Sequence, residues 1–360
     1  MDDNRKEKKV CVVGSGNQGT ALAAIIAANC IKLSGYQNEV NMYVYEEEID
    51  GKKLTEIINE THENVKYLPG KTLGSVVAIA DLVTAAKEAD FIVFAVPHNQ
   101  IKTVCAALLG KIKKSAFGVV AIKGFVLTDN NTLEPASKVI SNLLKIQTCV
   151  LTGFAFPNEV VSGKLCETTI GCKSKAMGVV LSDLLQSETL SVVLMEDVDV
   201  VEVLATLRTL VGCAAGFVDG LGQKYNWKAA IFRIGLIEMV KFLDLFYPHI
   251  KLSSVFESSS IADLLVSCYY GQERRVSEGM ARTGMTLGEA ERHLLDGRGL
   301  GGARVARDVY HFLRHREVEE FFPLFTAVHR VFTGELRPKE FLMCIHSHPE
   351  HGLRLQRIVW

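Results

Sequence analysis

The sequence of 360 residues has no excess of charge of either sign, no internal repeat and no low-complexity segment. Its 40 lysines and arginines are balanced by 41 aspartates and glutamates. A protein that binds nucleic acid or a membrane surface through its overall charge needs a net positive field, so this balance argues against both kinds of partner. Any anionic ligand must therefore be held by a few local groups.

Long apolar runs are also missing. No apolar stretch approaches the ~18 residues that span a bilayer, and the charged residues 1–9 are not followed by the apolar segment of a signal peptide. We therefore expect a cytoplasmic protein without a membrane segment.

The nine cysteines lack any paired spacing. Single cysteines in odd number within apolar segments argue against a disulfide framework, and we interpret them as small core residues. His346, His348 and His351 lie close together near the C-terminus, but they lack the spacing that fixes zinc geometry. We expect a solvated tail there and no metal site.

What the sequence does contain is a large apolar fraction, 48% against 22% charged residues, which is typical of a globular protein. The first half alternates short β-rich runs with helical segments, which predicts a doubly wound (Rossmann-type) α/β domain with a parallel sheet buried on both faces. The expected strands are 10–13, 40–45, 76–80, 91–96, 117–122, 149–152, 167–172 and 191–195.

From about Asp197 onward, apolar residues recur every three or four positions. This period predicts an all-helical second domain, with loops at Gly271 and at 297–302. The length of the chain also favours two domains. We place them at residues 1–196 and 197–360.

A glycine-rich turn follows the first expected strand and opens a helix expected over 20–29. It consists of Gly14, Ser15, Gly16, Asn17, Gln18 and Gly19. The first glycine permits the tight turn, the second lets the backbone approach a pyrophosphate, and the third lets helix and strand pack closely. Because the helix N-terminus adds N–H donors, the motif predicts a dinucleotide site, with a tight turn that binds nothing as the alternative.

An acidic residue is then expected at the end of the second strand, where it accepts hydrogen bonds from the adenosine ribose. Glu46 follows Tyr45 at this place, which favours NAD over NADP. Because Glu47 and Glu48 continue the acidic run, the sequence leaves open which carboxylate is used.

Eight longer motifs follow one another along the chain. They are GSGNQG at Gly14, EEEIDGKKLTEIIN at Glu46, HENVKYLPG at His62, VPH at Val96, IKG at Ile122, CETTIGC at Cys166, AGFVDGLG at Ala215 and HPEH at His348. Through them the chain resembles the eukaryotic, cytosolic NAD-dependent glycerol-3-phosphate dehydrogenases. The resemblance implies a homodimer with an NAD-binding first domain and a substrate-binding second domain, which interconverts dihydroxyacetone phosphate and sn-glycerol 3-phosphate.

The resemblance also assigns site residues. It implies that Lys123 of the IKG motif contacts a substrate oxygen or phosphate, and that Asp263 belongs to the catalytic set. Ser267 stands where the family has threonine, four residues after Asp263 and therefore on the same helix face. A surface lysine at a strand end and an exposed helical acid are the respective alternatives.

Other positions depart from the family pattern. The active-site lysine of the family aligns with Arg208, which stays charged and is a poor acid or base. The phosphate-binding G-G-R-N segment aligns with a segment ending in Gln272 and Glu273, so a cation is lost and a carboxylate is gained. The adjacent Arg274 or Arg275 can compensate only through a shift of the loop, and an alignment offset of one or two residues is the alternative.

The cofactor side departs as well. Gln18 replaces the tryptophan of the glycine turn, Gln100 replaces the aromatic residue after VPH, and Ala155, Phe156 and Pro157 replace part of an A-N-I-A segment. The family's K-L-Q-G contact becomes Gly299, Leu300, Gly301 and Gly302. We expect Gln18, Gln100 and Pro157 to lie at the cofactor.

Three hypotheses follow. The first is an active dehydrogenase in which Lys123 or Lys228 handles the proton and Arg208 holds the phosphate. The second is a catalytically impaired paralogue kept for NAD binding or as an assembly component. The third is an oxidoreductase that takes a cationic or polar substrate group opposite Gln272 and Glu273.

Overall fold

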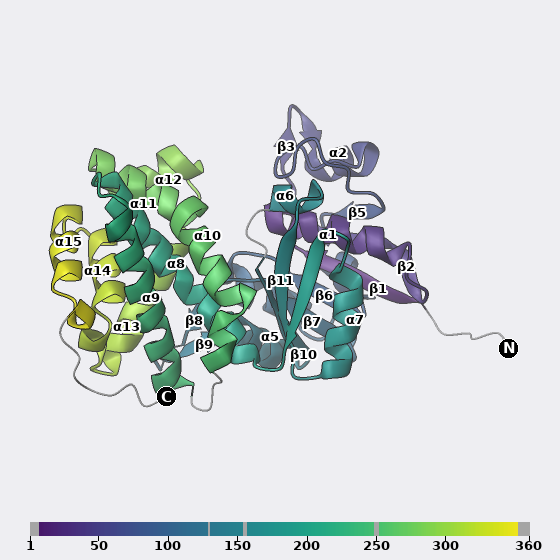
Figure 1. Cartoon of the computed structure of the whole chain (residues 1–360). Helices are drawn as coiled ribbons and strands as arrows, with labels where there is room; N and C mark the ends of the chain where they lie inside the picture. Colours follow the sequence, from purple (N-terminus) through teal and green to yellow (C-terminus); the bar gives the residue numbers. More distant parts are fainter. Residues whose placement is uncertain (1–6, 129, 154–156, 248–251, 352–360) are drawn as a thin grey trace. The chain divides into compact units, whose positions relative to one another are not determined.

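The structure is a computed structural model that describes residues 7–128, 130–153, 157–247 and 252–351. The chain divides into two compact units. The first consists of Met1–Val126 and Glu134–Glu202, and the second of Leu127–Leu133 and Val203–Trp360. The first unit is built on a sheet, and the second consists almost entirely of helices (Figure 1).

An eight-stranded sheet forms the centre of the first unit, in the order β12-β11-β10-β7-β6-β1-β2-β5. The strands are β1 (Lys8–Val13), β2 (Tyr36–Tyr43), β5 (Val76–Ile79), β6 (Phe91–Phe94), β7 (Phe117–Val120), β10 (Gln147–Thr152), β11 (Cys166–Gly171) and β12 (Leu190–Met195). All eight expected strands are present, and the doubly wound α/β fold is confirmed. The expectation of a purely parallel sheet is wrong at one pair, because β11 runs antiparallel to β10.

Helices cover both faces of this sheet. They are α1 (Asn17–Cys30), α2 (Leu54–Thr61), α3 (Leu82–Ala86), α4 (Ile101–Leu108), α5 (Ala136–Leu144), α6 (Pro157–Val161) and α7 (Lys175–Leu185), with the 3-10 turn η1 (His98–Gln100). Two short hairpins, β3 (Glu48–Ile49) with β4 (Lys52–Lys53) and β8 (Phe125–Leu127) with β9 (Leu133–Pro135), complete the strands and were not expected from the sequence.

Alternate residues of each central strand enter two separate apolar clusters. In β1, Val10 and Val12 belong to the cluster that includes α1 and α7, whereas Cys11 and Val13 belong to the cluster that includes α4 and α5. A sheet covered on both faces needs apolar side chains at both parities. This requirement explains the unbroken Val and Ile runs in the sequence.

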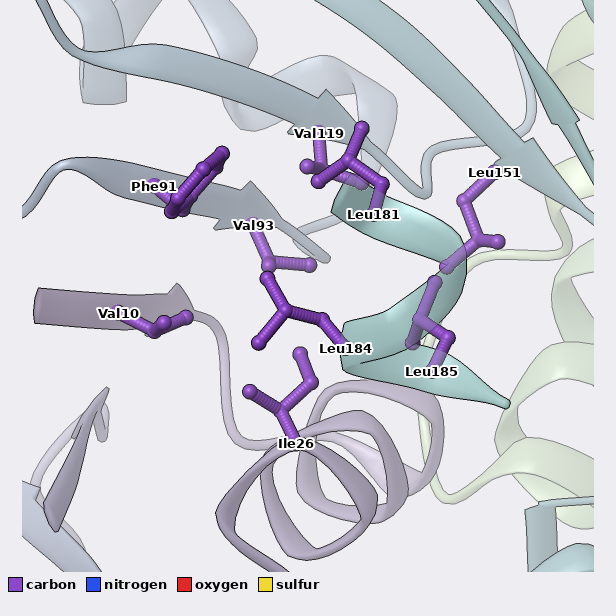
Figure 2. A pocket seen from close by; sticks show the side chains of 9 residues that line it. All are labelled: Val10, Ile26, Phe91, Val93, Val119, Leu151, Leu181, Leu184 and Leu185. Carbon is purple, nitrogen blue, oxygen red and sulfur yellow. The ribbon is translucent and has the colours of Figure 1, made fainter. Parts of the chain in front are cut away.

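The first cluster encloses a narrow cavity with room for about one water molecule (Figure 2). Only apolar side chains line it: Val10, Ile26, Phe91, Val93, Val119, Leu151, Leu181, Leu184 and Leu185. A buried water needs two to four polar partners, and this lining offers none. We therefore interpret the cavity as a packing gap of the core and not as a ligand site.

From residue 203 onward the described chain is helical, as predicted. The elements are α8 (Val198–Gly220), α9 (Tyr225–Phe246), η2 (Leu252–Phe256), the π-helical turn η3 (Ser258–Ala262), α10 (Asp263–Tyr270), α11 (Gln272–Thr283), α12 (Leu287–Leu295), α13 (Gly301–His315), η4 (Glu319–Phe321), α14 (Pro323–Phe332), α15 (Pro338–His346) and η5 (Pro349–His351). Gly301 and Gly302 begin α13, so the loop expected over 297–302 is two residues too long.

Helix α8 is long and apolar enough to cross a membrane, so the expectation that no apolar stretch reaches this length is wrong. Its most apolar 18 residues are all buried inside the protein. Neighbouring backbone also approaches it closely, because a Cβ on Gly216 would lie 2.2 Å from the carbonyl oxygen of Arg274. These contacts are those of a core helix of a globular protein.

The expectation of a solvated tail at the C-terminal histidines is wrong for His348, whereas His346 and His351 are exposed. His348 is 2% exposed, and its Nε2 lies 2.9 Å from Oε1 of the buried Glu238. The same carboxylate accepts hydrogen bonds from the backbone N–H groups of Leu324 and Phe325 at the start of α14. The described residues contain no group of His, Cys, Asp and Glu able to hold a metal, and residues 353–360 lie outside them.

Candidate functional site

The glycine turn joins β1 to α1. Gly14 has a φ of 120°, and a Cβ there would lie 2.6 Å from the carbonyl oxygen of Ala95. A Cβ on Gly19 would lie 2.1 Å from the carbonyl oxygen of Gly14. Since atoms cannot approach so closely, the fold itself requires these two glycines, whether or not a ligand is bound.

Gly16 is different. Its φ is −66°, which any residue adopts, and a Cβ there would meet no atom within 4 Å. The packing of the protein gives no reason for glycine at this position. A missing side chain here does leave room for a pyrophosphate to approach the backbone, which is the role predicted for the second glycine.

The N-terminus of α1 also has donors to offer. It has no side-chain cap and no acidic residue in its first turn. The buried Nε2 of Gln18 has no hydrogen-bond partner among the residues that the structure describes. Unsatisfied N–H groups at a helix start attract an anion. Ser15, Gly16, Asn17 and Gln18 therefore fit the pyrophosphate of a dinucleotide.

Asn64 is part of this site and was not singled out from the sequence. It is 0% exposed, and its Nδ2 donates to the carbonyl oxygen of Ser15 at 3.0 Å and to Thr20 Oγ1 at 2.9 Å. Its Oδ1 accepts from the Tyr67 N–H at 3.2 Å. Only its place in the HENVKYLPG motif could have drawn attention to it.

The acidic run after β2 is already engaged within the protein. Glu46 accepts hydrogen bonds from Thr55 N at 3.2 Å and from Thr55 Oγ1 at 2.6 Å, at the start of α2. Glu47 pairs with Lys66, whereas Tyr45 is 72% exposed. The expected contact of Glu46 with the ribose stays a prediction. The ribose hydroxyls would have to share the carboxylate with Thr55.

The other residues expected at the cofactor follow β6 and β10, which run parallel to β1 within the sheet. Gln100 is exposed and ends η1, after β6. Pro157 is half-buried and begins α6, after β10. Because the carboxyl ends of parallel strands lie at one edge of a sheet, both belong to the edge that carries the glycine turn. Ala155 and Phe156 lie outside the described residues.

Lys123 is half-buried, three residues beyond β7 at the same edge. The next residue, Gly124, has a φ of 151°, and a Cβ there would lie 2.7 Å from Cγ of His98. This close contact fixes the loop after β7 against the loop after β6. The backbone that carries Lys123 is therefore held in place by the contact between Gly124 and His98.

In the second unit, the structure brings Arg208 of α8 together with Asp263 and Ser267 of α10. Arg208 Nη2 lies 3.1 Å from Asp263 Oδ2, and Nη1 donates to Ser267 Oγ. The side chains of Arg208 and Asp263 are 6% and 5% exposed. The expected placement of Asp263 and Ser267 on one helix face is correct, and the guanidinium lies against that face.

The hydrogen bonding of this cluster is incomplete. Within the described chain, Arg208 Nε and Nη2 and Asp263 Oδ2 are buried without a hydrogen bond of good geometry. Leaving a buried donor or acceptor unsatisfied costs roughly 1–3 kcal/mol, and buried polar atoms usually have a protein or water partner. The cluster can therefore accept further polar contacts from water or a ligand.

Gln272 and Glu273 begin α11, and the two side chains differ in environment. Gln272 is exposed, whereas Glu273 is half-buried. A Cβ on Gly302 would lie 2.8 Å from Glu273 Cγ and 2.8 Å from Cys213 Sγ, so Glu273 packs where α13 begins. Burial raises the pKa of the Cys213 thiol, and the nearby Glu273 carboxylate raises it further.

Two other cations near this region are held in ion pairs. Arg274 Nε lies 2.6 Å from Asp219 Oδ2, and its Nη1 lies 3.0 Å from Glu278. Lys228 Nζ lies 2.6 Å from the same Asp219 oxygen. In this structure Arg274 is therefore engaged by two carboxylates, and Lys228 shares Asp219 with it.

Comparisons with known protein families match nearly the whole chain. The N-terminal part of the NAD-dependent glycerol-3-phosphate dehydrogenases matches residues 9–178, and their C-terminal part matches residues 197–343. The solved structure of glycerol-3-phosphate dehydrogenase from Saccharomyces cerevisiae is 35% identical, with a TM-score of 0.84 over 94% of this chain and 99% of that one.

Two curated relatives are more similar in sequence. The cytoplasmic NAD-dependent glycerol-3-phosphate dehydrogenase of Drosophila ezoana is 51% identical over 95% of this chain and 98% of its own length. The human protein of the same name is 45% identical over 96% of this chain and 99% of its own. These comparisons give no support to the hypothesis of a catalytically impaired paralogue. The chain belongs to the NAD-dependent glycerol-3-phosphate dehydrogenase family.

Proposed function

We propose that this chain is a cytoplasmic NAD-dependent oxidoreductase that interconverts dihydroxyacetone phosphate and sn-glycerol 3-phosphate. The observation that supports this most directly is Gly16, which packing does not require and which leaves the open N-terminus of α1 accessible to a pyrophosphate. We further propose that residues 1–196 bind NAD, and that residues 197–360 bind the substrate and form a homodimer.

On the cofactor side, the backbone of Ser15, Gly16 and Asn17 and the free Nε2 of Gln18 would hold the pyrophosphate. Tyr45 and Glu46 would lie at the adenosine end, and Gln100 and Pro157 at the nicotinamide end. Gly14 and Gly19 keep the turn tight. When bound, NAD takes up or supplies the hydride at substrate C2.

Reduction of the ketone adds a hydride to C2 and a proton to the C2 oxygen, so a proton donor is needed. We assign this role to Lys123, since an ammonium group can give up a proton whereas a guanidinium does not. Arg208 then acts as a fixed positive charge that Asp263 orients and partly neutralises. Ser267 holds the other edge of the guanidinium.

The site proposed for the substrate phosphate, at Gln272 and Glu273, binds an anion more weakly than a site with a cationic side chain would. The Gln272 amide can donate hydrogen bonds to phosphate oxygens, whereas the Glu273 carboxylate repels them. We therefore expect a high Michaelis constant for dihydroxyacetone phosphate, together with ordinary affinity for NADH.

The test is NADH oxidation that depends on dihydroxyacetone phosphate, measured beside a calorimetric NADH titration of the same protein. Turnover that falls about a hundredfold or more in Lys123→Met would support the proposal, since a positioned proton-transfer group contributes roughly 10²–10⁴-fold. Intact NADH binding without turnover in the unaltered protein and in Arg208→Lys would overturn the catalytic proposal. Light scattering after gel filtration tests the homodimer, because a monomer at micromolar concentration would contradict it.

A further inference from the structure

The Ser15 carbonyl oxygen is held from inside the protein. It accepts one hydrogen bond from Asn64 Nδ2 at 3.0 Å and a second from Thr20 Oγ1 at 2.8 Å. All three residues are buried, with exposed fractions of 7% for Ser15 and 0% for the other two. Asn64 also donates to Thr20 Oγ1, so the two donors support each other.

The direction of this carbonyl fixes the direction of the next N–H. A peptide group is planar and trans, so the Gly16 N–H points away from the side to which the Ser15 carbonyl points. No backbone acceptor is found for the Gly16 N–H in the part of the chain that the structure describes. Anchoring the carbonyl inside therefore presents this N–H on the open side of the turn, above Gly16.

We propose that Asn64 is a positioning residue for the cofactor: it holds the Ser15–Gly16 peptide so that the Gly16 N–H faces the pyrophosphate of NAD. If this peptide rotated by half a turn, it would direct a carbonyl oxygen at the phosphate, which is repulsive. The inference rests on the proposed function, because it concerns the same dinucleotide site.

The test is the dissociation constant for NADH, measured by calorimetry on the full chain carrying Asn64→Asp. The carboxylate still accepts the Tyr67 N–H but cannot donate to the Ser15 carbonyl oxygen. We expect the dissociation constant to rise about tenfold or more, because a hydrogen bond to a charged group is lost or misdirected. The turnover number at saturating NADH should change much less than the Michaelis constant for NADH.

Asn29→Asp is the matched control. Asn29 is also buried, and its Nδ2 also donates to two carbonyl oxygens, of Leu184 at 2.9 Å and Gln186 at 3.1 Å, at the opposite end of α1. It should lower the melting temperature without changing NADH affinity. Equal NADH affinity in Asn64→Asp and the unaltered chain would overturn the inference, and so would an equal loss of affinity in Asn29→Asp.

Substitutions at Thr20 keep the inference testable if Asn64→Asp fails to fold. Thr20→Ser keeps the hydroxyl that donates to Ser15 and should bind NADH normally, whereas Thr20→Val removes it and should bind more weakly. Equal affinities in these two variants would count against the inference. Absence of NADH binding in the unaltered chain would overturn the proposed function and the inference together, whereas normal binding with no effect of any variant would overturn the inference alone.

Discussion

The glycine turn of the first unit and the Arg208 cluster of the second are both polar sites, but they are built in opposite ways. The turn is defined by backbone: Gly14 and Gly19 are required by contacts as short as 2.1 Å, and its donors remain available. The cluster is defined by side chains, and its guanidinium already faces a carboxylate at 3.1 Å.

This difference determines how each site tolerates change. A backbone site binds through groups that every residue carries, so only the positions that need glycine are constrained. A side-chain site changes its chemistry with each substitution, because charge, donor geometry and proton affinity belong to the residue type. A substitution at Arg208, Gln272 or Glu273 would therefore change the possible chemistry of the second unit, whereas the turn tolerates changes at positions that do not need glycine.

The largest effect is expected for Asp263→Leu. It leaves the buried Arg208 guanidinium without its counter-charge, which should lower the free energy of unfolding by about 3–5 kcal/mol. Urea denaturation measures this loss. In the double variant Arg208→Met with Asp263→Leu, most of the stability should return, because apolar residues can replace both charges.

An exposed ion pair of the same unit is the control. Arg330 and Glu335 lie 3.7 Å apart with side chains 43% and 56% exposed, so Glu335→Gln should change stability by less than about 1 kcal/mol. If Asp263→Leu were as mild as this control, then Arg208 would have another buried partner. The cluster would then not depend on the ion pair.

A smaller loss, up to about 3 kcal/mol, is expected for Gly19→Ala. The added Cβ would lie 2.1 Å from the Gly14 carbonyl oxygen, so either α1 or the turn must move. NADH binding should be lost together with stability. Thermal unfolding and an NADH titration on the same sample measure both.

Gly16→Ala separates packing from binding. Its Cβ would contact nothing within 4 Å, so the melting temperature should stay within a few degrees of the parent value. NADH should nevertheless bind more weakly, because the methyl group occupies the space left for the pyrophosphate. Unchanged NADH affinity in Gly16→Ala would show that the cofactor does not approach this glycine.

Much of the fold could be predicted from the sequence, because strand and helix periods are local properties. The β-rich runs located all eight strands, although β2 begins four residues before the expected 40–45, and α1 begins at Asn17, three residues before the helix expected over 20–29. The antiparallel direction of β11 and the burial of His348 could not be predicted, because they depend on contacts between residues far apart in the chain.

The candidate site was predictable to a similar, partial extent. Helical spacing predicts that Asp263 and Ser267 lie on one helix face. It does not predict that both contact Arg208, which is 55 residues from Asp263 and 59 from Ser267 in sequence. Glu46 was assigned to the ribose because of its position after β2. The sequence could not reveal that Thr55 donates a hydrogen bond to each of the two carboxylate oxygens of Glu46.

Glu202 is a buried carboxylate of the first unit that contrasts with Asp263. Asp263 faces the charged Arg208, whereas Glu202 accepts hydrogen bonds from the neutral N–H and hydroxyl groups of Ser137. Burial raises the pKa of Glu202 to about 7. In the unfolded chain this carboxyl loses its proton at the ordinary value, whereas in the folded chain it retains the proton until about pH 7. Its stabilising contribution is therefore fully present below about pH 4 and is lost as the pH rises toward 7.

Between pH 5 and 7, this difference amounts to a loss of about 2 kcal/mol in the free energy of unfolding. Glu202→Gln should remove this loss, so the variant should gain stability relative to the parent as the pH rises. Urea denaturation at each pH gives the difference. The exposed Glu188→Gln should follow the parent, and parallel pH profiles for Glu202→Gln and the parent would contradict the assignment.

The smallest effect is expected at the apolar cavity beneath β1 and β6, where Val93 faces Ile26 and Leu184 (Figure 2). Val93→Ile adds one methyl group toward this gap and should raise the free energy of unfolding by about 0.5 kcal/mol. Val12→Ile, at a fully buried position that does not line the cavity, should instead lower it by about 1 kcal/mol through overpacking. Neither variant touches Ser15, Gly16 or Asn64, so NADH affinity should stay at the parent value in both. A change in affinity with Val93→Ile would mean that the core beneath the sheet is coupled to the glycine turn, and that the backbone of the turn is less rigidly fixed than its own contacts imply.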